Sequence, residues 1–144
     1  MKAATSLSAR TDPLADVHLT VHRATHEIGG NCIELSTSDG HRIILDVGRP
    51  LDAPPDARHL LPKSLDLNAA VDGVLITHAH QDHYGLLEDI PAQWPIYSGP
   101  ATERLIRLSS AISGKKLPHA FHPWKSGAKF EIGPFAVTPR LAMR

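Results

Sequence analysis

The sequence predicts an α/β protein in which a mixed β-sheet is flanked by helices. Near the N-terminus, apolar and polar residues alternate on both sides of an Asp-Gly turn, which is typical of antiparallel strands. Further along, residues 72–77 form a compact apolar and β-branched run of the kind found in buried parallel strands. Residues 100–113 carry apolar side chains at helical spacing. The 144 residues, 42% of them hydrophobic, are enough for one domain with a substantial core.

The N-terminal part of this domain is predicted to be an antiparallel unit of three strands. In the first strand, Val17, Leu19 and Val21 share one side and three polar residues share the other. Between the second and third strands, Asp39-Gly40 tolerates the positive φ angles that a tight hairpin requires. The expected strands are, in order, residues 16–23, 32–36 and 42–47.

The rest of the chain is predicted to mix loops, helices and short strands. Four prolines break residues 49–63 into a loop, because proline lacks an N–H and has a fixed φ. Pro100 at the start and Gly114 past the end mark the clearest helix, whose face opposite the apolar residues carries Arg104 and Arg107. The expected elements are a helix at 65–70, a strand at 72–77, a helix at 85–90, a strand at 95–97, a helix at 100–113 and β-prone runs at 130–132 and 135–138.

Composition excludes several classes of protein. Cys32 is the only cysteine, so a disulfide framework is excluded, and we interpret it as a small buried hydrophobe. The longest apolar runs are far shorter than the roughly 20 residues of a membrane helix, so no membrane association is expected. Residues 1–15 lack the apolar segment of a secretory signal and are predicted to be a flexible tail before a domain at 16–144. We therefore expect a cytoplasmic protein.

The formal net charge of zero conceals an uneven distribution. Residues 1–100 hold seven Lys and Arg against 13 Asp and Glu, whereas residues 101–144 hold eight against two. A basic segment of this kind suits phosphate groups, and Arg104 and Arg107 are the predicted phosphate contacts. A solvated charged face explains the same charges equally well.

The motif that carries chemistry follows the predicted strand at 72–77. Residues two apart in an extended segment face the same way, so His78 and His80 can present both imidazoles to one metal ion. Asp82 and His83 join them if the chain turns at once, and their oxygen and nitrogen donors suit a second divalent ion. Three histidines and one aspartate in six residues therefore predict metal binding rather than a polar surface loop.

This motif, with the strand before it, resembles the signature of the metallo-β-lactamase superfamily of hydrolases. Asp46 in Leu45-Asp46-Val47-Gly48 matches an earlier aspartate of that family, which lies near the metals without necessarily binding them. Two stretches, Glu27-Ile28-Gly29-Gly30-Asn31 and Gly99 to Ile106, are similar to the branch that contains ribonuclease J and other β-CASP nucleases. The resemblance covers roughly residues 17–138.

The resemblance implies a fold and a role for each motif residue. His78 and His80 would hold the first metal and Asp82 and His83 the second, with Asp82 also catalytic as an aid to proton transfer. The implied cofactors are two Zn²⁺ ions, with Mn²⁺ as the alternative. The implied fold is an αββα sandwich of two similar halves, of which this chain would supply the first half and the start of the second.

The chain departs from the family pattern after its last predicted strand. The family has further histidine and aspartate ligands there, whereas no histidine follows His122 in this sequence. We therefore expect a shortened relative or a fragment whose two metals keep two protein ligands each. His119 and His122 can in principle fill the gap, but a histidine pair flanked by prolines favours a surface loop. An uncovered sheet face would also permit self-association.

The leading hypothesis for function is a metal-dependent hydrolase that cleaves RNA or a related phosphate ester with a metal-activated water. Within the enzyme class, thioester and lactam substrates are alternatives. Outside it, the alternatives are a non-catalytic remnant, suggested by the missing ligands, and a nucleic-acid-binding module, suggested by the basic segment.

Overall fold

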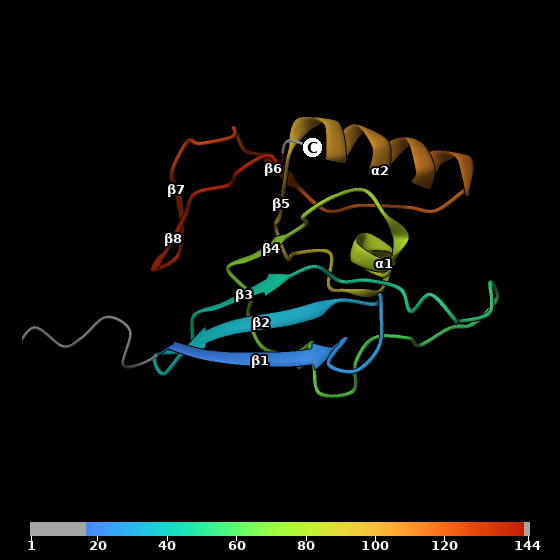
Figure 1. Ribbon diagram of the computed structural model, residues 1–144, viewed down its shortest axis with the longest axis horizontal. Coiled ribbons are helices and arrows are strands. Elements are labelled where there is room, and N and C mark those ends of the chain that lie inside the picture. The colour runs from blue at the N-terminus through green and yellow to red at the C-terminus, as the bar shows by residue number, and fades with distance from the viewer. Residues whose placement is uncertain (1–16, 143–144) are drawn as a thin grey trace, which may run out of the picture.

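A six-stranded mixed sheet organises the computed structural model, which describes residues 17–142. The strands lie in the order β1-β2-β3-β4-β5-β6, which Figure 1 shows from bottom to top. The first three pair antiparallel and the last four pair parallel. A separate hairpin, β7-β8, lies at the left of the same view. The strands are β1 Val17–Arg23, β2 Cys32–Thr37, β3 Arg42–Leu45, β4 Gly73–Leu75, β5 Ile96–Ser98, β6 Phe121–Pro123, β7 Phe130–Ile132 and β8 Phe135–Val137.

Three helical segments complete the structure. They are α1 Gln81–Tyr84, the 3₁₀ helix η1 Leu87–Asp89 and α2 Pro100–Ile112. In the described part of the chain, no helix is long and apolar enough to cross a membrane. The predicted α/β class with a mixed sheet and flanking helices is confirmed, and so is the long helix that begins at Pro100.

The core lies against one face of the sheet. Glu34, Ile44, Val74 and Ile96 are directly paired in successive strands and therefore share this face. The buried side chains packed there come from the connections between strands and from α2, and include Leu65, Leu86, Leu87, Ile90, Trp94 and Ile106. Cys32 is also buried in this cluster, where burial raises the pKa of its thiol to about 12, as expected of an unreactive hydrophobe.

The opposite face is apolar and only partly covered. The hairpin β7-β8 covers one end of it, where Ile132 is buried and Tyr97 stacks on Phe130 with ring centroids 5.7 Å apart. Gly73 permits this approach, since a Cβ there would lie 2.8 Å from the Tyr97 ring. At the other end, Leu19 on β1 is 64% exposed. Self-association through this face stays a prediction.

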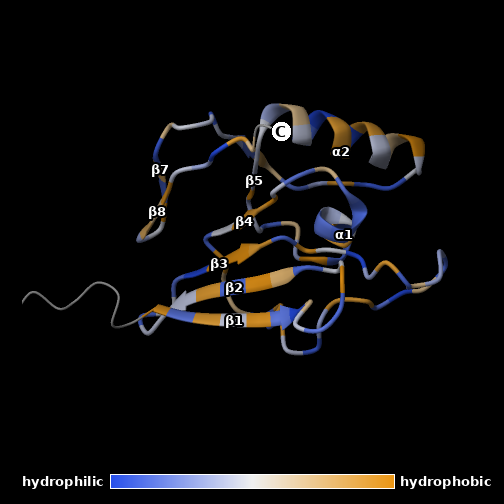
Figure 2. Cartoon of the chain, in the orientation of Figure 1, coloured by the Kyte–Doolittle hydropathy of each residue, from blue (hydrophilic) through white to orange (hydrophobic). Residues whose placement is uncertain are grey.

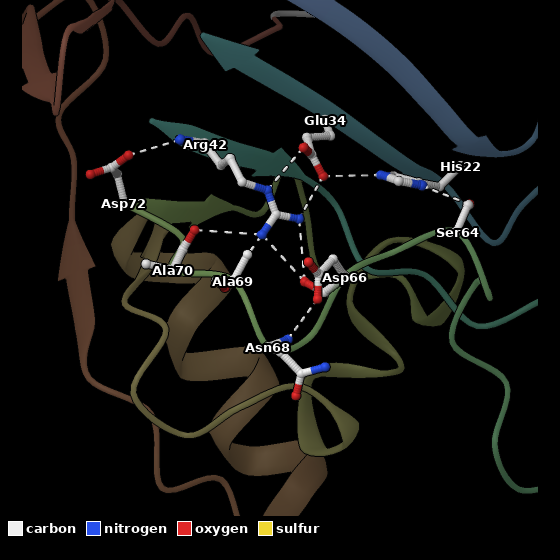
Figure 3. Close-up of polar contacts among 9 residues, drawn as sticks. All are labelled: His22, Glu34, Arg42, Ser64, Asp66, Asn68, Ala69, Ala70 and Asp72. Atoms are coloured by element: carbon white, nitrogen blue, oxygen red, sulfur yellow. Dashed lines mark hydrogen bonds and ion pairs between the residues drawn. The ribbon is translucent and has the colours of Figure 1, made fainter. Parts of the chain in front are cut away.

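Residues 65–70 are not helical, and the prediction of a helix there is wrong. The Arg42 guanidinium donates hydrogen bonds to the carbonyl oxygens of Asp66, Ala69 and Ala70, at 3.3 to 3.5 Å (Figure 3). These carbonyls point at a buried cation, so they are not available for the repeating bonds of a helix. A contact with a residue more than 20 positions away in the sequence therefore overrides the local pattern.

Arg42 is itself held by a buried network on the core face. It forms two hydrogen bonds with the Glu34 carboxylate, at 2.9 and 2.8 Å. His22 approaches the same carboxylate at 3.1 Å and contacts Ser64 Oγ at 2.8 Å through its other ring nitrogen. Figure 3 shows that the network joins the first three strands to the segment before β4. The connection that leads into the site is thereby fixed to the sheet.

This network predicts a loss of stability in acid. Hydrogen bonds from Arg42 lower the pKa of Glu34 below its ordinary value of 4.5, and His22 adds to this effect against the opposing effect of burial. The carboxylate therefore contributes stability above its unfolded pKa, and this contribution is lost as pH falls through the lowered folded value. We expect urea denaturation between pH 6 and about pH 3 to show a smaller acid-induced loss in Glu34→Gln than in the wild type. Equal pH dependence in both would contradict the prediction.

Two further elements differ from those predicted. The helix expected at 85–90 is instead α1 followed by η1, because the chain leaves α1 at Gly85 and the Leu86 N–H donates to the Val47 carbonyl at 3.0 Å. The strand β6 is absent from the prediction, since three residues ending in proline carry no periodic signal. His122 lies exposed on β6, but His119 is buried, so interpreting the pair as a surface loop is wrong for His119.

Candidate metal centre

The histidine motif lies where β4 leaves the sheet. Ile76 and Thr77 extend the strand direction, the chain turns at His80, and α1 begins at the next residue. Because α1 begins directly after His80, the chain coils back at once and brings the His83 ring to 4.0 Å from that of His78, measured between ring centroids. The immediate turn that the motif requires is therefore present.

The structure brings the three predicted histidines together. The ring centroid of His78 lies 4.6 Å from that of His80 and 4.0 Å from that of His83. His78 Nε2 and His80 Nδ1 are 3.1 Å apart, so two donor nitrogens converge. Asp82 completes the group, with its Oδ2 at 3.5 Å from His83 Nε2.

Asp46 organises this cluster from the end of β3. Its carboxylate accepts hydrogen bonds from the Thr77 backbone N–H at 2.8 Å and from the Thr77 hydroxyl at 2.9 Å. The same carboxylate lies 2.7 Å from His83 Nδ1. Asp46 has a φ of +60°, in the left-handed region that aspartate tolerates better than most residues. This backbone conformation ends β3 earlier than predicted and turns the buried side chain toward the motif.

Backbone contacts hold the motif against two neighbouring loops. Within 46–49, Val47 N–H donates to the His83 carbonyl at 2.8 Å and Arg49 N–H to the Gln81 carbonyl at 2.9 Å. A Cβ on Gly48 would collide with the Asp82 carbonyl oxygen, so only glycine permits this approach. The position of the motif is therefore set by loops from distant parts of the sequence.

The surroundings of His78 favour its neutral imidazole. Burial lowers the pKa of His78 below its ordinary value, and the nearby His83 and His80 lower it further, whereas Asp46 and Asp82 oppose the shift. Neutral imidazole has the free lone pair that a metal ligand needs. The donor set of three imidazoles and one carboxylate is chemically suited to a divalent ion such as zinc. Within residues 17–142, however, no group of three or more histidine, cysteine, aspartate or glutamate side chains is arranged to hold a metal ion.

An apolar groove of about 570 Å³ adjoins the motif. His80 and Asp82 line one part, and Leu105, Leu108 and Ile112 of α2 line another. These three side chains are 57%, 58% and 78% exposed, so the apolar stripe of α2 lines the groove and is not part of the core. Figure 2 shows the hydrophobic residues of α2 in orange. Sequence periodicity identified this stripe but could not distinguish a groove wall from a core face.

The two arginines predicted to contact phosphate lie on α2 outside the groove lining. Arg107 donates to Glu103 at 2.8 Å, and its guanidinium lies 4.6 Å from the centre of the Phe121 ring. Arg104 is exposed. A role for either residue toward phosphate stays a prediction.

Comparison with known families agrees with this geometry. The model of the metallo-β-lactamase superfamily matches residues 27–141, which include the motif, Asp46 and the groove wall. The chain belongs to this superfamily. Membership implies binding of a divalent metal ion in general.

Similar proteins include a ribonuclease and a transcription termination factor. Ribonuclease J of Sinorhizobium meliloti is 31% identical over 68% of this chain and 19% of its own length. The transcription termination factor FttA of Methanosarcina mazei is 33% identical over 72% of this chain and 18% of its own length. This chain therefore spans about a fifth of the length of these two relatives.

A solved structure supports the fold independently. A protein of unknown function from Enterococcus faecalis V583 superposes with a TM-score of 0.64 at 19% identity, covering 83% of this chain and 36% of its own. At this identity the likeness concerns the fold alone.

Sequence reasoning assigned no role to two residues that contact the motif. Thr77 donates two hydrogen bonds to Asp46, and Asn31 lies against His83. For Thr77 the available signal was its position directly before the motif. For Asn31 it was its place after Gly29-Gly30, at the end of the stretch that is similar to the ribonuclease J branch.

Proposed function

We propose that this chain forms part of a metal-dependent hydrolase that cleaves phosphodiester bonds in RNA or a related phosphate ester. His78 and His80 are the proposed ligands of one divalent ion, and Asp82 and His83 those of a second. The observation that carries the proposal is the convergence of the three imidazoles and the Asp82 carboxylate at the end of β4.

Each residue has a defined part in the proposed chemistry. Two Zn²⁺ ions, or Mn²⁺ ions as the alternative, would activate water and neutralise charge on the phosphoryl oxygens when bound. The Asp46 carboxylate accepts a hydrogen bond from the Nδ1–H of His83, which leaves the lone pair of Nε2 free to bind a metal ion. Asp82 would also assist proton transfer to or from the attacking water. The apolar side chains of the groove would offer a contact surface for a part of the substrate beside the reacting group.

The substrate class is supported by two kinds of observation. One relative is named a ribonuclease, and its similarity includes most of this chain. The groove beside the motif has an apolar wall, which suits the faces of nucleobases, and the exposed Arg104 lies one turn before Leu108 on α2. Arg104 and Arg107 are the proposed phosphate contacts.

The proposed function predicts that His80→Ala abolishes hydrolysis. Removing this imidazole leaves His78 without its neighbouring donor, so we expect at least a 100-fold lower rate on a single-stranded RNA oligonucleotide with Zn²⁺ or Mn²⁺. His18→Ala is the matched control, because His18 is exposed on the edge strand β1. Loss of activity in His80→Ala alone supports the proposal. Equal rates in all three proteins, or no hydrolysis by the wild type, would contradict it for these 144 residues.

A second candidate is a remnant that binds metal weakly and catalyses nothing. The observation in its favour is that the described residues include no arranged group of three or more metal-binding side chains. Equilibrium dialysis followed by elemental analysis separates the candidates. About two ions retained per chain supports the hydrolase, as in two-metal sites, whereas loss of all metal on dialysis supports the remnant.

A further inference from the structure

The side chain of Asn31 contacts the motif from the loop between β1 and β2. Its Nδ2 lies 3.3 Å from His83 Nδ1 and 3.4 Å from His83 Nε2. Among residues 17–142, these two ring nitrogens are its only partners within hydrogen-bonding distance. Because this half-buried amide contacts a single functional side chain, it can influence the orientation of that side chain as well as the stability of its own loop.

The backbone of Asn31 fixes where this amide lies. Its N–H donates to the Asp82 carbonyl at 3.0 Å, and its own carbonyl accepts from the Gly48 N–H at 2.9 Å. The residue therefore bridges the two segments that carry Asp46 and the motif. Movement of the motif relative to the sheet would break these bonds.

The contact is with the imidazole ring as a whole and not with one of its nitrogens. A group almost equidistant from both ring nitrogens cannot lie along the lone pair of either, because the two lone pairs point in different directions. The amide thus restricts the tilt of the His83 ring through an N–H to ring contact, while the lone pair of Nε2 stays free. Asp46 fixes the position of Nδ1, because its carboxylate holds that nitrogen at 2.7 Å.

We propose that Asn31 is a positioning residue for His83, which aims Nε2 toward Asp82 and so prepares the second half of the metal centre. The Asp46 carboxylate and the Thr77 hydroxyl contact only Nδ1 of the ring, at 2.7 and 3.3 Å, and so leave the ring some freedom to tilt about that atom. Asn31 removes this freedom before a ligand arrives. The inference rests on the proposed function only for its consequence for metal binding, because the position of His83 can be measured in the metal-free protein.

The test compares Asn31→Ala and Asn31→Asp with the wild type. Asn68→Ala is the matched control, because Asn68 is exposed and, among the described residues, no hydrogen bond joins it to the motif. One measurement is nitrogen-15 NMR of the histidine rings in the metal-free protein, at a pH where imidazole is neutral. The second is the affinity for Co²⁺ with its visible absorption spectrum, which reports coordination geometry. Urea denaturation of the metal-free proteins gives their stability.

We expect a single Nδ1-protonated form of His83 in the wild type and in Asn68→Ala. Asn31→Ala should broaden or split these signals, lower Co²⁺ affinity tenfold or more and alter the spectrum. Asn31→Asp keeps the shape but replaces the N–H donor with an oxygen, so it should disturb the His83 signals as Asn31→Ala does. Unchanged His83 signals in Asn31→Ala would overturn the inference, including the case in which only stability falls.

The two proposals fail in different ways. If the wild type binds no Co²⁺ but Asn31→Ala still disturbs the His83 signals, the metal function fails and the positioning role holds. If the wild type binds Co²⁺ and Asn31→Ala matches it in affinity, spectrum and ring signals, the positioning role fails and the metal function holds.

Discussion

Replacing Arg42 with alanine is expected to lower the free energy of unfolding by about 3–5 kcal/mol. The substitution removes both hydrogen bonds to Glu34 and leaves that carboxylate buried with only His22 as a partner. It also leaves the carbonyl groups of the 66–70 segment without their donor. Losing one partner of a buried pair costs more than the pair contributes, because the remaining charge is left desolvated. Urea denaturation followed by circular dichroism measures the difference.

The matched control for this prediction is Arg58→Ala. Arg58 is exposed and donates only to carbonyls of its own loop, so we expect a change within about 0.5 kcal/mol. If Arg42→Ala does not fold, the double variant Arg42→Met with Glu34→Leu replaces both charges with apolar side chains and should recover folding. A loss below about 1 kcal/mol in Arg42→Ala would show that the network does not hold the 65–70 segment.

The Arg42 network also explains which parts of the fold could be predicted from sequence. Strands β1 to β3, strand β5 and helix α2 have local signals, namely alternation, an Asp-Gly turn and helical spacing bounded by Pro100 and Gly114. Residues 65–70 carry a helical pattern, but their conformation is decided by a guanidinium from another strand. Strand β6 exists because Phe121 to Pro123 pair with β5, and this partner is not visible in three residues of sequence.

The candidate site also has residues that local sequence predicts and residues whose role depends on distant contacts. The motif residues could be predicted because they are close in sequence and follow a recognisable strand. Asn31 and Gly48 could not be assigned a role, because their contacts with Asp82 and His83 join loops more than 30 residues apart. The apolar stripe of α2 was visible as a periodic pattern, but its exposure depends on what the rest of the fold leaves uncovered.

Asp46→Asn is expected to weaken metal binding by about 10-fold to 100-fold with little loss of folding. Asparagine tolerates the left-handed φ of +60° almost as well as aspartate, so the turn after β3 is kept. Its amide, however, has no negative charge with which to hold the His83 Nδ1 proton. The ring then loses its preferred tautomer, and the basicity of Nε2 falls. Competition with a chromophoric chelator at constant pH measures the affinity.

A second substitution at the same position separates charge from backbone strain. Asp46→Ala loses the carboxylate and also places a residue that disfavours positive φ in the turn, so it should weaken metal binding as Asp46→Asn does and cost a further 1–2 kcal/mol of stability. Asp52→Asn is the control, because Asp52 is exposed in a nearby loop. If Asp46→Asn binds metal within twofold of the wild type, Asp46 acts only on the backbone through Thr77, and His83 is oriented by its contacts with Asn31, Thr77 and His78.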